Sequence, residues 1–363
     1  MAAFLLLGGA FTAWLVLVVP LHNEILDNDL TLVYIGARIG LENGWSHLYS
    51  LSLQHQLFTE LRPSAPFNDG ERFLSPPPFA WLIVPLTALG PAGATYVWLI
   101  VSVASLIAAW WIAAPGNVWI RALWLLAALA WYPVQYSLSL AQPAPVVLFA
   151  VIACWALAER GRPYIAGVVL GASVVKPQLA LVLPLVLLAA GRWKIAAAWA
   201  ATVGAAAIVS VIVIGSQGVG DYRSLLAEAQ NVTNNRYFTS AFVLGPGLAS
   251  YAWQGVVIVA AAGAAVLNRN ASQARLVALG LVATAIGATY WHLQDYAILV
   301  GAVWLFWRSE PPAWQRWWLL VVAVGGELAW PLTPVPILVG LIAWFVFLAL
   351  PEHRSPRPVG VPV

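Results

Sequence analysis

Long apolar runs separated by short polar connectors dominate the chain. They lie at residues 3–20, 74–90, 94–114, 118–135, 143–158, 163–176, 178–190, 194–214, 249–267, 276–290, 293–307, 315–330 and 336–350. The runs are continuous rather than alternating, which favours α-helices over strands. A helix also satisfies its own backbone polar groups, as a segment that crosses lipid must. We therefore expect an all-α polytopic membrane protein.

The composition agrees with this class. Of the 363 residues, 62% are hydrophobic and 9% are charged, and the mean hydropathy is +0.83. Soluble domains carry about 25% charged residues. The single cysteine, Cys154, excludes an intramolecular disulfide and a cysteine-rich metal site. A formal charge of +3 gives no indication of a nucleic-acid partner.

Five connectors are short and rich in arginine and lysine. They are 159–163 (ERGRP), 191–194 (GRWK), 268–275 (NRNASQAR), 308–316 (RSEPPAWQR) and 352–358 (EHRSPRP). Connectors of this kind remain in the cytoplasm, so the intervening turns are expected on the extracytoplasmic face. That face then receives 21–73, Gln142, 176–178, 215–248, 291–295 and 331–336. A polar site is therefore predicted there.

The number of runs raises a parity problem. Thirteen crossings would leave the termini on opposite sides, so one early run is expected not to cross. Residues 118–141, interrupted by Pro133, are the best candidate, entering and leaving on the extracytoplasmic side. About 12 spans (11–13) remain, with both termini cytoplasmic at the plasma membrane. We expect one integral-membrane domain over 1–350 and a cytoplasmic tail at 351–363.

The two large extracytoplasmic loops are 21–73 and 215–248. The first contains two amphipathic stretches, DLTLVYIGARIGLENG and YSLSLQHQLFTELR. Their apolar residues recur at helical spacing, which predicts helices that lie in the membrane interface.

Acidic residues at the start of the first loop helix are candidates for chemistry. Asp29 could serve only as a helix cap, since aspartate is favoured there. Alternatively, it is a carboxylate that removes a proton from a hydroxyl, and Asp27 is a rival for that role. Tyr34 and Arg38 follow on the same helix and are candidates for the substrate pocket.

The turn at Lys176, Pro177 and Gln178 lies between two apolar runs. Lys176 could merely extend to the interface. Its predicted place on the same face as Asp29 also suits a phosphate carried by a lipid. Gln178 adds a hydrogen-bond donor and acceptor.

Further polar candidates are spread along the extracytoplasmic turns. The segment WHLQD places His292 and Asp295 three residues apart, although such residues often serve only as interfacial solvation. The remaining candidates are Gln142, Asn231, Asn234, Arg236 and Glu327. Neither a metal-binding HExxH nor a phosphate-binding GxxxxGKS occurs, so the motifs do not support nucleotide hydrolysis.

Taken together, these segments resemble the polyprenol-phosphate-dependent mannosyltransferases of glycosyltransferase family 87. The resemblance covers about residues 20–300 and is carried by YIGARIGLENGWSHLY after an acid, FLSPPPFAWLIVPLTALGP, the stretch from LAQPAP through KPQ to GRWK, and YWHLQDY. The KPQ segment is its most specific part. Two departures occur: Ala141 stands where the family has glycine, and the spacing from Asp29 to Tyr34 is one residue longer.

The resemblance implies a GT-C fold with an extracytoplasmic active site. It also implies that mannose is transferred, with inversion, from a polyprenyl-phosphate donor to a hydroxyl of a glycolipid or polysaccharide acceptor. Asp29 would be the base, while Lys176, Gln178, His292 and Arg236 would hold the donor phosphate. Neither a metal nor a cofactor would be required. The partners would be membrane lipids, the donor and the acceptor, and the oligomeric state is left open.

Two other classes compete with a transferase. A transporter or lipid flippase would also carry ionisable residues among its spans. However, the chain has no repeat of two similar halves, and its polar residues gather on one face rather than at the midplane. A structural membrane subunit would leave the long first loop with its paired acids unexplained.

Overall fold

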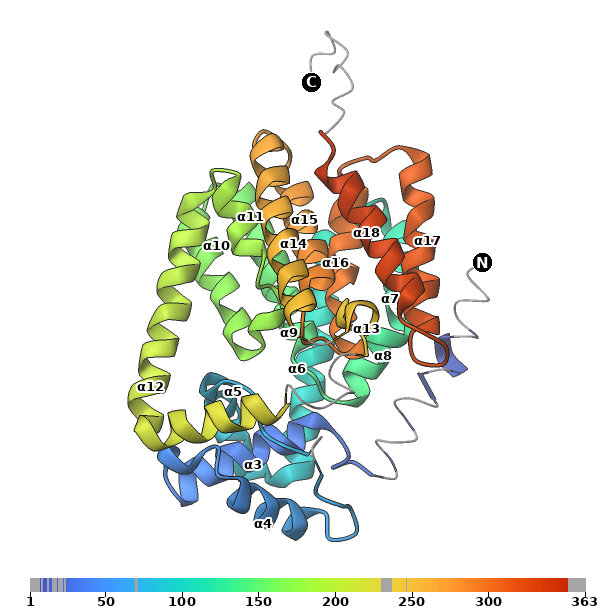
Figure 1. Cartoon of the computed structure of the whole chain (residues 1–363). Helices are drawn as coiled ribbons and strands as arrows, with labels where there is room; N and C mark the ends of the chain where they lie inside the picture. Colours follow the sequence, from blue (N-terminus) through green and yellow to red (C-terminus); the bar gives the residue numbers. More distant parts are fainter. Residues whose placement is uncertain are drawn as a thin grey trace.

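The computed structural model describes residues 24–68, 71–229, 237–245 and 247–351, together with 7, 9–11, 13–14, 18 and 22. Within these residues the chain forms only helices and connecting turns, so the all-α prediction is confirmed for this part. The predicted first span (3–20) and the tail from 352 onward lie mostly or wholly outside it. Figure 1 shows a bundle of upright helices above a layer formed by the first loop.

The first loop folds into two helices that pack on each other. α3 (Asp29–Glu42) and α4 (Leu51–Leu61) match the two amphipathic stretches. Ile35 and Ile39 of α3 form a small core with Leu57 and Phe58 of α4. The opposite face of α3 joins the main core, so this helix is covered on two sides.

The early runs differ from the prediction. Residues 74–90 form α5 (Pro77–Ile83) and η3 (Val84–Leu89), which span only about 22 Å at the usual rises per residue. Lipid hydrocarbon is about 30 Å thick. The chain then reverses at Gly90 (φ 71°), and Phe79 of α5 lies 5.3 Å from Trp98 of α6, ring to ring. The run at 74–90 is therefore a short segment alongside α6 (Gly90–Ala113).

The run at 118–141 extends along the bundle as a bent pair of helices, an arrangement that fits either a broken span or the predicted re-entrant segment. α7 (Val118–Ala130) begins beside the end of α6, where Arg308 Nε donates to Ala113 O at 2.7 Å. A 62° bend then leads into α8 (Tyr132–Ser139), which ends at Gln142. Arg308 belongs to a basic connector, whereas Gln142 lies at the other end. Residues 118–141 therefore run between the two ends of the bundle while 74–90 do not, and which early run fails to cross the membrane stays a prediction.

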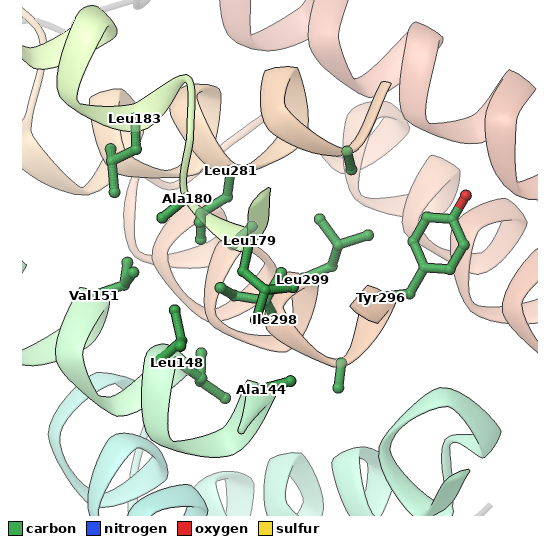
Figure 2. Packing of buried hydrophobic residues seen from close by; sticks show 14 of the residues in the cluster. Ala144, Leu148, Val151, Leu179, Ala180, Leu183, Leu281, Tyr296, Ile298 and Leu299 are labelled. Atoms are coloured by element: carbon green, nitrogen blue, oxygen red, sulfur yellow. The ribbon is translucent and has the colours of Figure 1, made fainter. Parts of the chain in front are cut away.

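The rest of the bundle is built from helices of unequal length. They are α9 (Ala144–Glu159), α10 (Pro163–Leu170), α11 (Leu183–Ala189), α12 (Trp193–Ala229), α14 (Leu248–Leu267), α15 (Gln273–Gly287), α16 (Leu299–Arg308), α17 (Ala313–Leu328) and α18 (Val335–Ala349), with the single turn α13 (Ala241–Leu244). α15 is buried along almost its whole length. Figure 2 shows α9, the chain after the KPQ turn, α15 and the start of α16 meeting in the core.

Among the described residues, three helical stretches are long and apolar enough to cross a membrane by length and composition: Pro77–Ala113, Trp193–Ala229 and Leu248–Leu267. In the first, the reversal at Gly90 leaves α6 as the part that could form one span. The bent pair α7 and α8 adds a fourth if it counts as one span. The other apolar helices are shorter, so the count of about 12 spans stays a prediction. Large apolar side chains on α6 and α12 are exposed, as expected for helices that face lipid.

The long helix α12 breaks at Gly215, the residue at which the second large loop is expected to begin. Gly215 has φ 65°, a left-handed conformation that favours glycine, and it divides α12 into an upright part and a part that crosses the lower end. The crossing part rests on the first loop through Tyr222, whose ring lies 4.5 Å from that of Tyr49. Arg72 and Glu228 form an ion pair at 2.5 Å between the same segments. The two loops therefore form one layer over the bundle end.

Candidate active site

The turn between α8 and α9 joins the start of α3 through the backbone. Asp29 N donates to Leu140 O at 3.1 Å. The next residue, Ala141, has φ 49°, a left-handed conformation that favours glycine. Trp98 Nε1 donates to Ala141 O at 2.8 Å and holds this turn. A glycine at this position, as in the pattern that the sequence resembles, would adopt this conformation without strain.

Asp29 is the first residue of α3 but not its cap. Asn28 occupies the cap position, and its side chain accepts a hydrogen bond from Thr31 N at 3.2 Å. The Asp29 carboxylate thus does not cap the start of the helix, and it lines a cavity instead. Asp29 is therefore not the cap of α3.

Four polar side chains from distant segments form a continuous chain. The Gln142 amide donates through Nε2 to Asp29 Oδ2 and accepts from Lys176 Nζ at 2.6 Å. Lys176 Nζ also lies 2.5 Å from Asp295 Oδ1. The amide can orient only one way, since the lysine must donate to its oxygen. A carboxylate and a cation are therefore linked through one amide.

The electrostatics of Asp29 suit a base. Burial raises the pKa of its carboxyl to about 6, although the nearby Lys176 ammonium opposes this increase. The group is then ionised at neutral pH and more basic than an ordinary aspartate.

His292 and Asp295 lie together at the turn after α15. Asp295 Oδ2 accepts from His292 N at 3.0 Å, and Asp295 N donates to His292 O at 3.0 Å. This reciprocal pair fixes the start of η7 (Leu293–Ile298). Burial lowers the pKa of the His292 imidazole, so the ring is neutral near pH 7.

These residues border a cavity of about 650 Å³ between the loop layer and the bundle. The sequence candidates that line it are Asp27, Asp29, Gln142, Lys176, Gln178 and His292. Asp295 lies behind it, fully buried against Lys176. Across the described residues, no three His, Cys, Asp or Glu side chains form a group that could hold a metal.

Asp27 differs from Asp29 in its surroundings. Its carboxylate is 55% exposed and lies 2.8 Å from Arg62 Nη1. The Asp29 carboxylate has no arginine partner and accepts a hydrogen bond from the Gln142 amide instead. The environment therefore distinguishes the two rivals.

Three other candidates, Tyr34, Arg38 and Glu327, do not line the cavity. Tyr34 is buried, with its hydroxyl 3.5 Å from Thr87 O. Arg38 pairs on the outer surface with Glu42 at 2.8 Å. Glu327 accepts from Tyr132 N at 3.0 Å between α17 and α8. Asn231, Asn234 and Arg236 lie outside the described residues.

The comparison with protein families was made on the whole chain. The model of glycosyltransferase family 87 matches residues 73–289. The chain belongs to glycosyltransferase family 87. No curated protein and no solved structure matches it. As a family member the protein is a membrane glycosyltransferase, and the enzyme class predicted above is confirmed.

The family model covers only part of the site. Gln142 and Lys176 lie inside the matched range, while Asp29 precedes it and His292 follows it. The structure nevertheless brings all four to the cavity or its wall.

Several lining residues of this family 87 protein were not predicted from the sequence. They include Arg62, Glu71, Arg72, Tyr136, Tyr222, Phe238, Tyr290 and Trp330. The charged ones lie in loop segments whose spacing gives no periodic signal. The aromatic ones resemble interfacial anchors in sequence, and only the fold places them together.

Proposed function

We propose that the protein transfers a sugar from a polyprenyl-phosphate donor to a hydroxyl group of a glycolipid or polysaccharide acceptor. Mannose is the expected sugar, and the reaction is expected on the extracytoplasmic face of the plasma membrane. The observation that carries this proposal is the chain from Asp29 through Gln142 to Lys176 at the wall of one cavity. It joins a base and a cation, the two groups this transfer requires.

Asp29 acts in the proposed reaction as the general base. The acceptor oxygen attacks the anomeric carbon, and the hydroxyl proton passes to the Asp29 carboxylate. The bond from the anomeric carbon to the phosphate oxygen breaks, and the leaving polyprenyl phosphate keeps the electron pair. A single displacement of this kind inverts the anomeric configuration. The pKa of about 6 supports the role.

Lys176 faces the negative charge that develops on the leaving phosphate. Without the donor, its ammonium is balanced by the fully buried Asp295. The donor phosphate would bring a second anion to the same nitrogen. His292 would add a neutral N–H donor, and Gln178 an amide, at the cavity wall. Such preorganised donors stabilise charge at the moment it forms, so the proposal routes no step through a metal.

Three aromatic rings group together at the cavity wall. The ring centroids of Phe238 and Trp330 are 5.9 Å apart in a stacked arrangement, and Tyr136 lies 6.4 Å from Trp330. All three rings line the cavity. Aromatic faces of this kind pack on the C–H faces of sugar rings, which supports a glycan-bearing acceptor.

A donor assay tests the proposed function. The purified protein in lipid nanodiscs would receive extracted lipid acceptors and either radiolabelled polyprenyl-phosphate mannose or radiolabelled GDP-mannose. We expect label in the acceptor only from the polyprenyl-phosphate donor. Polyprenyl-phosphate arabinose in a parallel reaction tests the choice of sugar. Transfer from the nucleotide donor alone would contradict the proposal.

A further inference from the structure

A second cavity lies where three basic connectors meet. It has a volume of about 360 Å³ and is lined by residues from 158–163, 191–195 and Gln273. It shares no lining residue with the site cavity. α10 and α11 lead from the KPQ turn to these connectors, so the second cavity lies at the opposite end of the bundle.

Three helices begin at the wall of this cavity. α10 starts at Pro163, α12 at Trp193 and α15 at Gln273, and each of these residues lines it. The start of a helix carries a partial positive charge and unpaired N–H groups. No side chain caps the start of α10. Ser272 caps the start of α15 by accepting from Arg275 N at 3.3 Å, but the partial positive charge of all three helix starts at this wall still favours an anion.

The side chains at the cavity add full positive charge. Arg192 and Lys194 line it, and none of its lining residues is acidic. Arg192 Nε and Gln273 Oε1 are buried, with no hydrogen-bond partner in the described part of the chain. Buried polar atoms normally have a partner. The Arg192 guanidinium lines the cavity and keeps one N–H donor that no described residue uses.

The rim of the cavity carries aromatic rings at the surface. Trp193 and Tyr164 are each about half exposed. Lys194 Nζ lies 5.9 Å from the Trp193 ring centroid and 5.8 Å from that of Tyr164. Exposed tryptophan and tyrosine beside a lysine are typical of the level of lipid headgroups. The rim therefore indicates a ligand that arrives from the membrane.

We propose that this second cavity binds the phosphate of an anionic phospholipid headgroup. The lipid belongs to the leaflet that faces the basic connectors, opposite the active site. Arg192 and Lys194 bind the phosphate, the three helix starts contribute partial charge, and Trp193 and Tyr164 pack on the glycerol region. This site is independent of the proposed sugar transfer, because none of its residues borders the site cavity.

Native mass spectrometry of the full-length protein tests this proposal. The protein would be released from nanodiscs of phosphatidylcholine containing phosphatidylglycerol, and retained lipids counted. We expect retained phosphatidylglycerol on the wild type, and about fivefold weaker retention in Arg192→Gln and in Lys194→Gln. The matched control is Arg269→Gln, an exposed arginine on the same face that does not line the cavity; it should retain lipid like the wild type.

Three results would overturn the proposal. Unchanged retention in both Arg192→Gln and Lys194→Gln would remove the cavity as the site. An equal loss in Arg269→Gln would indicate general charge attraction. Displacement of the lipid by millimolar inorganic phosphate would assign the cavity to soluble phosphate instead of a lipid. A thermal unfolding scan of each variant in phosphatidylcholine alone checks that the fold is retained.

Discussion

Lys176 and Asp295 form a buried ion pair, with Nζ 2.5 Å from Oδ1. The side chains are 12% and 0% exposed. The pair joins the KPQ turn to the turn after α15, and so fixes the lysine that faces the proposed donor phosphate. Its partner Gln142 extends the connection to Asp29.

Removing either member of this pair should destabilise the protein. Lys176→Met or Asp295→Asn leaves one buried group without its counter-charge, which costs about 3 kcal/mol. The double variant removes both charges and should unfold closer to the wild type. Thermal unfolding in detergent measures this double-mutant cycle. Additive losses in the double variant would show that the two charges do not interact.

The rate of transfer should depend on pH through Asp29. Its folded pKa of about 6 lies above the ordinary value, so the base becomes protonated as the pH falls through about 6. The kcat/KM of the wild type should then decline below that pH. Lys176→Met should move the midpoint to higher pH, because the ammonium lowers the Asp29 pKa.

His292 provides the control for this assignment. Its pKa is already lowered by burial, so His292→Asn should weaken transfer without moving the midpoint upward. A midpoint that disappears in His292→Asn would assign the titration to the histidine instead.

Gln142 should act by positioning. Gln142→Leu keeps a similar side-chain volume and removes both hydrogen bonds to charged groups. We expect the rate of sugar transfer to fall about 10- to 100-fold. We expect the loss mainly in kcat, because the amide orients the base rather than the acceptor. Steady-state kinetics separates kcat from KM. A change confined to KM would indicate that Gln142 binds substrate instead.

The orientation of the bundle can be tested with single cysteines. Cys154 is buried, so the native chain should react little with a membrane-impermeant maleimide. Glu42→Cys, on α3 of the loop layer, should be labelled in intact cells from outside. Arg269→Cys, on a basic connector, should be labelled only after the membrane is opened. The reverse pattern would overturn the predicted topology.

Local patterns in the sequence were sufficient for much of the fold. The two amphipathic stretches predicted α3 and α4, because their apolar periodicity survives in the folded chain. The break at Gly215 was also predicted, since the long apolar run ends there. The paths of residues 74–90 and 118–141 could not be predicted. Apolar composition alone does not distinguish a segment at which the chain reverses from one that crosses the membrane. The Gly90 turn and the contact between Arg308 and Ala113 show these paths in the structure.

For the site, the sequence predicted only which residues lie on the same side of the bundle. Asp29, Lys176 and His292 were assigned to one side by charge bias in the connectors, and the cavity contains all three. Their linkage through Gln142 has no sequence signal, because it depends on the left-handed turn at Ala141. Arg38 was a candidate by proximity to Asp29, yet helical rotation directs it to Glu42 on the surface.

The central claim is that Asp29 is the base for transfer from a polyprenyl-phosphate sugar. The most direct measurement compares turnover of the wild type, Asp29→Asn and Asp27→Asn with this donor under single-turnover conditions. We expect Asp29→Asn to lose about 10²- to 10⁴-fold in rate while unfolding at the same or a higher temperature, and Asp27→Asn to retain most activity. Wild-type turnover in Asp29→Asn, with activity lost in Asp27→Asn, would contradict the account.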